Sequence, residues 1–222
     1  MASFGWPTFL LRSQLRKVKK ADKAEICDDL EKSMLYRCKP ESFEKLIVRT
    51  HFSRKELQQL YRAYKEGCPT GIVEIKRFKE IFAQFFPSGD VNRYADLVFR
   101  TFDDDRNGEI NFDEFAMTLS VLARGSPTEK LTWIFKLYDF EDTGLITQTN
   151  VCEIIKAMYD LITPRSKLPV TPSTINKHAA EVFQAIDIND VGAVTCEQFV
   201  SACANNETIR RGIDVLSVAN VF

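Results

Sequence analysis

The segment from Asp103 to Glu114 constrains the fold of this chain more than any other stretch. It places oxygen-bearing residues at alternate positions around Gly108, where a residue without a Cβ can turn sharply at a positive φ. Such spacing suits a hard divalent cation, because calcium takes about six to eight oxygen ligands. In chain order, the candidate ligands are Asp103, Asp105, Asn107, the backbone carbonyl of Glu109, Asn111 through a water molecule, and Glu114.

All constrained positions of this segment match the EF-hand loop, a calcium site held between two helices. Position 12 is decisive, because Glu114 can offer both of its carboxylate oxygens to the ion. Glu114 also follows Asn111 at the spacing at which two side chains cap the start of a helix. The sequence therefore predicts one calcium site, in which Glu114 is both a ligand and part of the next helix.

Three damaged copies of this loop accompany the intact one, and the turn glycines of the four loops are Gly71, Gly108, Gly144 and Gly192. In the first copy, residues 66–77, Cys68 and Pro69 replace the early ligands and Arg77 places a cation at position 12, so we expect no calcium there.

The third copy, residues 139–150, keeps Asp139, Glu141 and Thr143, but Asn150 at position 12 is uncharged. We expect weak calcium binding at best, or magnesium. In the fourth copy, residues 187–198, Val191 has no side-chain oxygen and Gln198 replaces the carboxylate, so we expect an empty loop.

Four such helix–loop–helix units, called hands below, predict an all-α fold of two lobes, in which paired loops share a two-residue β contact. Residues at position 8 should meet, Val73 with Ile110 and Ile146 with Val194. Apolar residues recur at helical spacing on both sides of the loops, for example Leu57, Leu60, Tyr61 and Tyr64, and Phe78, Ile81, Phe82 and Phe85.

We divide the chain into a variable arm (1–42), a lobe with hands 1 and 2 (43–125), a lobe with hands 3 and 4 (126–206) and a C-terminal helix (207–222). At the junction of the lobes, Gly125 suits a helix end, Ser126 an N-cap, Pro127 the first helical turn and Glu129 a capping partner. The arm holds a basic, amphipathic stretch at 8–20, which predicts either a membrane-surface helix or a solvated tail.

The composition excludes several other classes of protein. With 222 residues, 45% hydrophobic content and a net charge of −1, the chain can bury one or two cores and has no overall bias toward nucleic acid. Its six cysteines are dispersed, which indicates a reduced, intracellular chain, and no apolar run approaches the ~20 residues of a transmembrane helix. No nucleophile with an adjacent base is evident, so we expect no enzyme.

Several motifs resemble the neuronal calcium sensor family, and most closely its Kv-channel-interacting branch. They include Cys68–Gly71, Phe82–Pro87, Leu137–Asp139 and Ile155–Asp160, and the likeness runs from about Phe43 to the C-terminus. The chain departs from that pattern at Asn150 and Gln198, since members usually keep calcium ligands in their third and fourth hands. Ala2 stands where many members carry a myristoylated glycine, so we expect no myristoyl switch.

The resemblance implies a groove that receives an amphipathic helix of a target protein. Its candidate lining is Tyr61, Phe82, Phe85, Phe86, Leu97, Phe102, Leu119, Leu122 and Trp133. Each of these side chains could instead belong to the core, but we expect Trp133 and Phe86 to face the groove. Apolar residues of the C-terminal segment, such as Ile213 and Leu216, could occupy the groove until a target displaces them.

The leading hypothesis is a cytoplasmic, calcium-responsive regulatory subunit that binds a helix of a membrane protein. The resemblance points to a cytoplasmic segment of a voltage-gated potassium channel, and the basic arm predicts contact at the inner face of the plasma membrane. The main alternative is a constitutive accessory subunit with one structural calcium ion; regulation of another membrane protein or of a kinase, and a homo-oligomer, also stay open. A calcium buffer and a nucleic-acid binder are disfavoured.

Overall fold

The computed structural model describes residues 40–163 and 170–205, so the predicted helices at 8–20 and 207–222 lie outside it. The described part is mostly helical. Its helices are α3 (Pro40–Arg49), α4 (Arg54–Gly67), α5 (Ile75–Ala83), α6 (Asn92–Phe102), α7 (Phe112–Arg124), α8 (Pro127–Tyr138), α9 (Gln148–Ile162), α10 (Pro172–Ile186) and α11 (Cys196–Asn205). Its strands are β1 (Ile72–Glu74), β2 (Glu109–Asn111), β3 (Leu145–Ile146) and β4 (Val194–Thr195).

The four strands form two antiparallel pairs, and both predicted contacts between position 8 residues are confirmed. Val73 pairs with Ile110 in the β1–β2 sheet, and Ile146 pairs with Val194 in the β3–β4 sheet. Strands β1 and β2 each have three residues rather than the predicted two. The four position 8 residues, Val73, Ile110, Ile146 and Val194, are all buried. A loop with few calcium ligands therefore still has a packing role.

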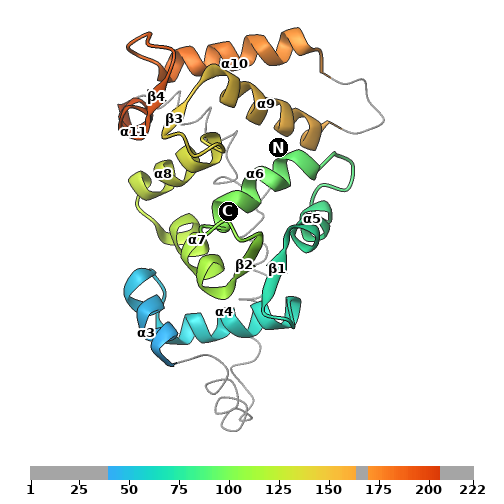
Figure 1. Ribbon diagram of the computed structural model, residues 1–222, viewed down its shortest axis with the longest axis vertical. Coiled ribbons are helices and arrows are strands. Elements are labelled where there is room, and N and C mark those ends of the chain that lie inside the picture. Colours follow the sequence, from blue (N-terminus) through green and yellow to red (C-terminus); the bar gives the residue numbers. More distant parts are fainter. Residues whose placement is uncertain (1–39, 164–169, 206–222) are drawn as a thin grey trace.

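The hands follow one another along the longest axis of the molecule, as Figure 1 shows. Helices α3 and α4 lie at one end, α10 and α11 at the other, and α6 to α9 between them. Helix α6 packs against α8 and α9, so the second hand contacts the third directly. The intact loop between α6 and α7 therefore lies close to the boundary of the two predicted lobes.

The junction between the lobes has the predicted local structure. Helix α7 ends at Arg124, Gly125 follows as its cap, and Ser126 caps α8. The Ser126 side chain accepts a hydrogen bond from the Glu129 amide at 3.3 Å, and the Glu129 carboxylate accepts one from the Ser126 amide at 2.7 Å. These reciprocal hydrogen bonds confirm the capping box and give the junction a fixed geometry.

A second contact between the predicted lobes joins the turn after α5 to the end of α9. The Asp90 amide donates to the Asp160 carbonyl at 2.9 Å. A Cβ built on the neighbouring Gly89 would lie 1.8 Å from the Leu161 carbonyl oxygen, so only a glycine fits there. The two halves thus touch through backbone as well as through helix packing.

Helix α5 ends before the last residue of its apolar pattern. The spacing of Phe78, Ile81, Phe82 and Phe85 extends a helix through Phe85, but α5 ends at Ala83. The Gln84 and Phe85 amides bond to the carbonyls three residues earlier, Ile81 and Phe82, which tightens the last turn. Pro87 follows and has no amide hydrogen with which to continue the helix. Phe85 therefore lies in a turn.

Candidate metal centre

The second, third and fourth loops share one backbone frame. Their position 1 aspartates are Asp103, Asp139 and Asp187, and each accepts hydrogen bonds from the amides at positions 5 and 6, with distances between 2.7 and 3.1 Å. The glycine at position 6 has a positive φ in all four loops. Position 4 also has a positive φ in these three loops, at Arg106, Asp142 and Asp190.

The first loop cannot adopt that frame throughout, because Pro69 stands at position 4 and its ring fixes φ near about −65°. Two basic side chains, Lys65 and Arg77, lie at this loop. The Lys65 ammonium donates to the Pro69 carbonyl at 2.8 Å, and Arg77 at position 12 pairs with Glu80 at 3.1 Å. Cys68 is buried, and burial raises the pKa of its thiol. That the first loop binds no calcium stays a prediction.

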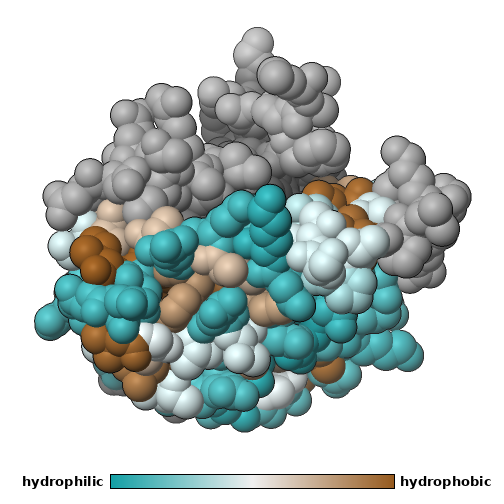
Figure 2. Space-filling view, turned by 90° about the horizontal axis from the view of Figure 1, so that it is seen from above, coloured by the Kyte–Doolittle hydropathy of each residue, from teal (hydrophilic) through white to brown (hydrophobic). Residues whose placement is uncertain are grey.

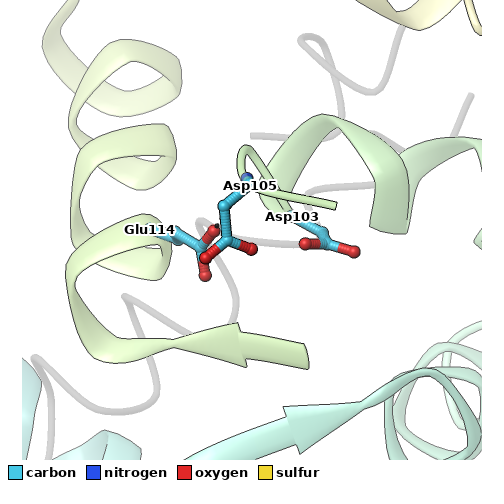
Figure 3. A group of neighbouring side chains, drawn as sticks. All are labelled: Asp103, Asp105 and Glu114. Carbon is cyan, nitrogen blue, oxygen red and sulfur yellow. Dashed lines mark hydrogen bonds between the residues drawn. The ribbon is translucent and has the colours of Figure 1, made fainter. Parts of the chain in front are cut away.

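Only the second loop brings three carboxylates together within the described residues. Ligand atoms of Asp103, Asp105 and Glu114 all lie within 4.8 Å of one another. Two oxygens bound to one calcium ion at about 2.3–2.6 Å can be at most about 5 Å apart, so this donor set fits the ion. Figure 3 shows Glu114 reaching from the first turn of α7 toward Asp105, with Asp103 beside them at the end of α6.

Backbone amides hold the carboxylate of Glu114 in place. One of its oxygens accepts from the Asn111 amide at 3.0 Å, and the other accepts from the amides of Asp104 and Asp105 at 3.0 and 3.4 Å. The Asn111 side chain in turn accepts from the Glu114 amide at 3.0 Å, which confirms the predicted capping arrangement. Glu114 is thus oriented by the loop that it closes.

Asn107 and Glu109 complete the predicted ligand set. The Asn107 side-chain oxygen accepts from the Glu109 amide at 2.7 Å, and its NH₂ group donates to Asp105 at 2.9 Å. Glu109 is half-buried at the start of β2, where the strand fixes its backbone carbonyl. The coordinating roles of Asn107, of Glu109 and of Asn111 through water stay predictions.

In the third and fourth loops, the position 12 side chains accept capping hydrogen bonds. The Asn150 side-chain oxygen accepts from the amide and hydroxyl of Thr147, at 2.9 and 2.5 Å. The Gln198 oxygen accepts from the Thr195 amide at 2.8 Å. In the third loop Glu141 is exposed, and Thr143 donates its hydroxyl to Asp139 at 3.0 Å. Magnesium or weak calcium binding at Asp139, Glu141 and Thr143 stays a prediction.

Two ion pairs that the sequence did not predict join the intact loop to the third hand. Lys136 of α8 pairs with Asp104 at 3.1 Å, and Arg106 pairs with Asp142 of the third loop. No local sequence signal identifies such pairs, because the partners belong to different hands. The hydrogen bonds of Tyr64 were also not predicted, because its spacing in the sequence places this residue only on an apolar helix face. A buried tyrosine hydroxyl usually has a hydrogen-bond partner. Here the partners are backbone carbonyls of the first and second loops.

The predicted groove residues divide into two groups. Tyr61, Phe85 and Phe86 are half-buried. The remaining side chains are buried, with exposed fractions of 5% or less: Phe82, Leu97, Phe102, Leu119, Leu122 and Trp133. Phe82 also stacks on Phe86, with ring centroids 5.4 Å apart. In this structure most of the predicted groove is thus covered, and its role in target binding stays a prediction.

Paired helix–loop–helix units with an acidic site in one loop define an EF-hand arrangement, and comparison with known families agrees. The family described as EF-hand domain pair matches residues 93–119, which contain nearly all of α6, the intact loop and the first part of α7. This match indicates calcium binding, at the place where Asp103, Asp105 and Glu114 converge. Within residues 40–163 and 170–205, no helix has the length and apolar character needed to cross a membrane.

Proposed function

We propose that this protein is a calcium-responsive regulator whose single calcium input is the loop from Asp103 to Glu114. One observation carries the proposal: three loops share a backbone frame, but only this one adds a carboxylate at position 12 to those at positions 1 and 3. The third and fourth loops have amides there instead, Asn150 and Gln198. A neutral amide lacks both the charge and the second oxygen that favour calcium.

Calcium binding at this site could affect the predicted groove through helices α6 and α7. Asp103 follows the end of α6, whereas Glu114 lies in the first turn of α7, so ligands from both helices would surround one ion. Holding them together fixes the angle between the two helices, which is the quantity that calcium changes in sensor EF-hands. Both helices carry predicted groove residues, including Leu97 on α6 and Leu119 on α7.

The proposed target is an amphipathic helix of another protein. Tyr61, Phe85 and Phe86 are the accessible part of the predicted groove, and the six buried residues would become available if the helices move apart. Figure 2 shows a largely hydrophilic face with separate hydrophobic patches on it. On the resemblance described above, we propose a cytoplasmic segment of a voltage-gated potassium channel as target. On the basic, amphipathic composition of the N-terminal arm, we propose peripheral membrane contact through it.

A constitutive accessory subunit is the second candidate, because the intact loop is tied to the third hand. The pairs Lys136–Asp104 and Arg106–Asp142 join them, and α6 packs against α8 and α9. Such contacts favour a rigid body in which the ion is structural. Sensor sites bind calcium at about 10⁻⁷ to 10⁻⁵ M, so the affinity of the loop separates the two candidates.

Calorimetric calcium titrations of the wild type and of Glu114→Gln test the proposal. We expect one site near micromolar affinity in the wild type and no measurable site in Glu114→Gln. Asp113→Asn is the matched control, because it removes the same charge from the neighbouring residue, which is not a ligand, and should lower the affinity much less than Glu114→Gln does. Two or more sites remaining in Glu114→Gln would show that the loops are assigned wrongly.

The same titrations, repeated with a synthetic peptide from a potassium channel N-terminus, test the regulatory role. We expect the peptide to bind the wild type more tightly when calcium is present, and to lose that dependence in Glu114→Gln. Equal peptide binding with and without calcium would favour the constitutive subunit, and no peptide binding in either condition would remove the proposed channel target.

A further inference from the structure

Tyr64 connects the first hand, whose loop has lost its early ligands, to the intact loop of the second. It lies on α4 with only 6% of its surface exposed, and its hydroxyl donates to the Ile110 carbonyl at 2.7 Å. A longer contact of 3.2 Å joins the same hydroxyl to the Gly71 carbonyl in the first loop. Ile110 occupies position 8 of the intact loop and follows Glu109, whose carbonyl is a predicted ligand.

The hydrogen bond from Tyr64 reaches Glu114 through a single peptide unit. The Ile110 carbonyl and the Asn111 amide belong to the same planar group, so fixing one fixes the other. The Asn111 amide donates to the Glu114 carboxylate at 3.0 Å. An amide whose carbonyl already accepts a hydrogen bond is a stronger donor, because hydrogen bonds in a chain polarise one another. The phenol thus both places and strengthens the donor that orients Glu114.

The ring of Tyr64 contacts the helix that carries Glu114. Its centroid lies 5.5 Å from that of Phe112 and 5.2 Å from that of Phe115. These two residues flank Glu114 in the first turn of α7. The hydroxyl therefore holds strand β2 while the ring holds the start of α7, and these two elements bring in the last ligands of the loop.

We propose that Tyr64 is a positioning residue for the calcium loop, supplied by the hand that has lost its own ligands. This inference rests on the proposed calcium role of the second loop and adds to it a reason for the close pairing of the two hands. Tyr64 touches no ion itself. It presets the Glu114 carboxylate through the Ile110–Asn111 peptide group, so that less ordering remains to be done when an ion binds.

The test is Tyr64→Phe, which removes the hydroxyl and keeps the ring. A net hydrogen bond is worth about 0.5–1.5 kcal/mol, so we expect calcium affinity to fall about twofold to twelvefold in calorimetric titration. We also expect the Asn111 amide proton to shift upfield in NMR spectra of the calcium-free protein, because its hydrogen bond to Glu114 weakens. Loss of packing alone would not produce that local shift.

Tyr159→Phe is the matched control, because the Tyr159 hydroxyl lies 3.3 Å from the His178 ring nitrogen in the other half of the molecule. We expect this variant to keep wild-type calcium affinity and an unshifted Asn111 amide. Wild-type affinity in Tyr64→Phe, or an equal loss of affinity in both variants, would overturn the proposal while leaving the calcium site intact. A wild type that binds no calcium would instead overturn the proposed function itself, and this inference with it.

Discussion

Replacing Gly89 with alanine should disrupt a close backbone contact between the two halves of the molecule. An added Cβ would lie 1.8 Å from the Leu161 carbonyl oxygen and 2.6 Å from its carbon, whereas ordinary contacts begin at 3.4 Å. Both atoms belong to the backbone, so no side chain can rotate away. The two segments would have to separate by more than about 1 Å, which also breaks the hydrogen bond from Asp90 to Asp160.

The expected cost follows from these two effects. Overpacking of a tight site costs about 1–3 kcal/mol, and the lost hydrogen bond adds about 1 kcal/mol. We therefore expect Gly89→Ala to lower the free energy of unfolding by about 3 kcal/mol. For a chain of this size, that corresponds to a fall in melting temperature of roughly 6–12 °C.

Thermal and urea unfolding in calcium-free buffer, followed by circular dichroism, measure this effect. Gly67→Ala is the control, because a Cβ built on this last residue of α4 meets nothing within 4 Å. We expect it to change the free energy of unfolding by no more than about 0.5 kcal/mol. Equal stability of Gly89→Ala and Gly67→Ala would refute the close approach of the two segments.

Two further predictions concern stability. The hydrogen bond from Arg124 lowers the pKa of Glu56 from 4.5 to about 2, so its stabilising effect is present above pH 4.5 and is lost as the pH falls toward 2. Because the pair is partly exposed, Glu56→Gln should cost only about 1 kcal/mol at neutral pH and flatten the unfolding profile between pH 4.5 and 2 in acid titrations. Ile146→Ala shortens a fully buried side chain of the β3–β4 pair and should lower the free energy of unfolding, measured in urea, by about 2–5 kcal/mol. Leu145→Ala, at a neighbour that is 38% exposed, should cost less than about 1 kcal/mol, and a similar loss in both variants would contradict the burial of Ile146.

The local features of this fold could be predicted from the sequence because neighbouring residues determine them. The capping boxes at Asn111 and Ser126 depend on residues a few positions apart, and the structure confirms both. The contacts of Val73 with Ile110 and of Ile146 with Val194 join distant residues, but the loop repeat sets their register. The three converging carboxylates follow from the same repeat.

Contacts outside the repeat could not be predicted. The turn at Gly89 meets α9, and Lys136 meets Asp104, through the relative placement of hands, which no local pattern encodes. The groove was ambiguous for a different reason. Helical spacing predicts that Phe82 lies on a packed apolar face, but both the core and a covered groove require that property.

The position 1 aspartates show why an acidic residue in a damaged loop is poor evidence for calcium. Asp139 and Asp187 each accept two backbone amides from the turn of their loop, as Asp103 does. Those amides point inward at the turn, and an aspartate satisfies them whether or not an ion is present. The capping role is therefore independent of metal binding and is sufficient to explain an aspartate at these positions. Position 12 differs, because Asn150 and Gln198 still accept a capping amide there but offer only one neutral oxygen. Glu114 alone combines that capping role with a second, charged oxygen of the kind that calcium favours.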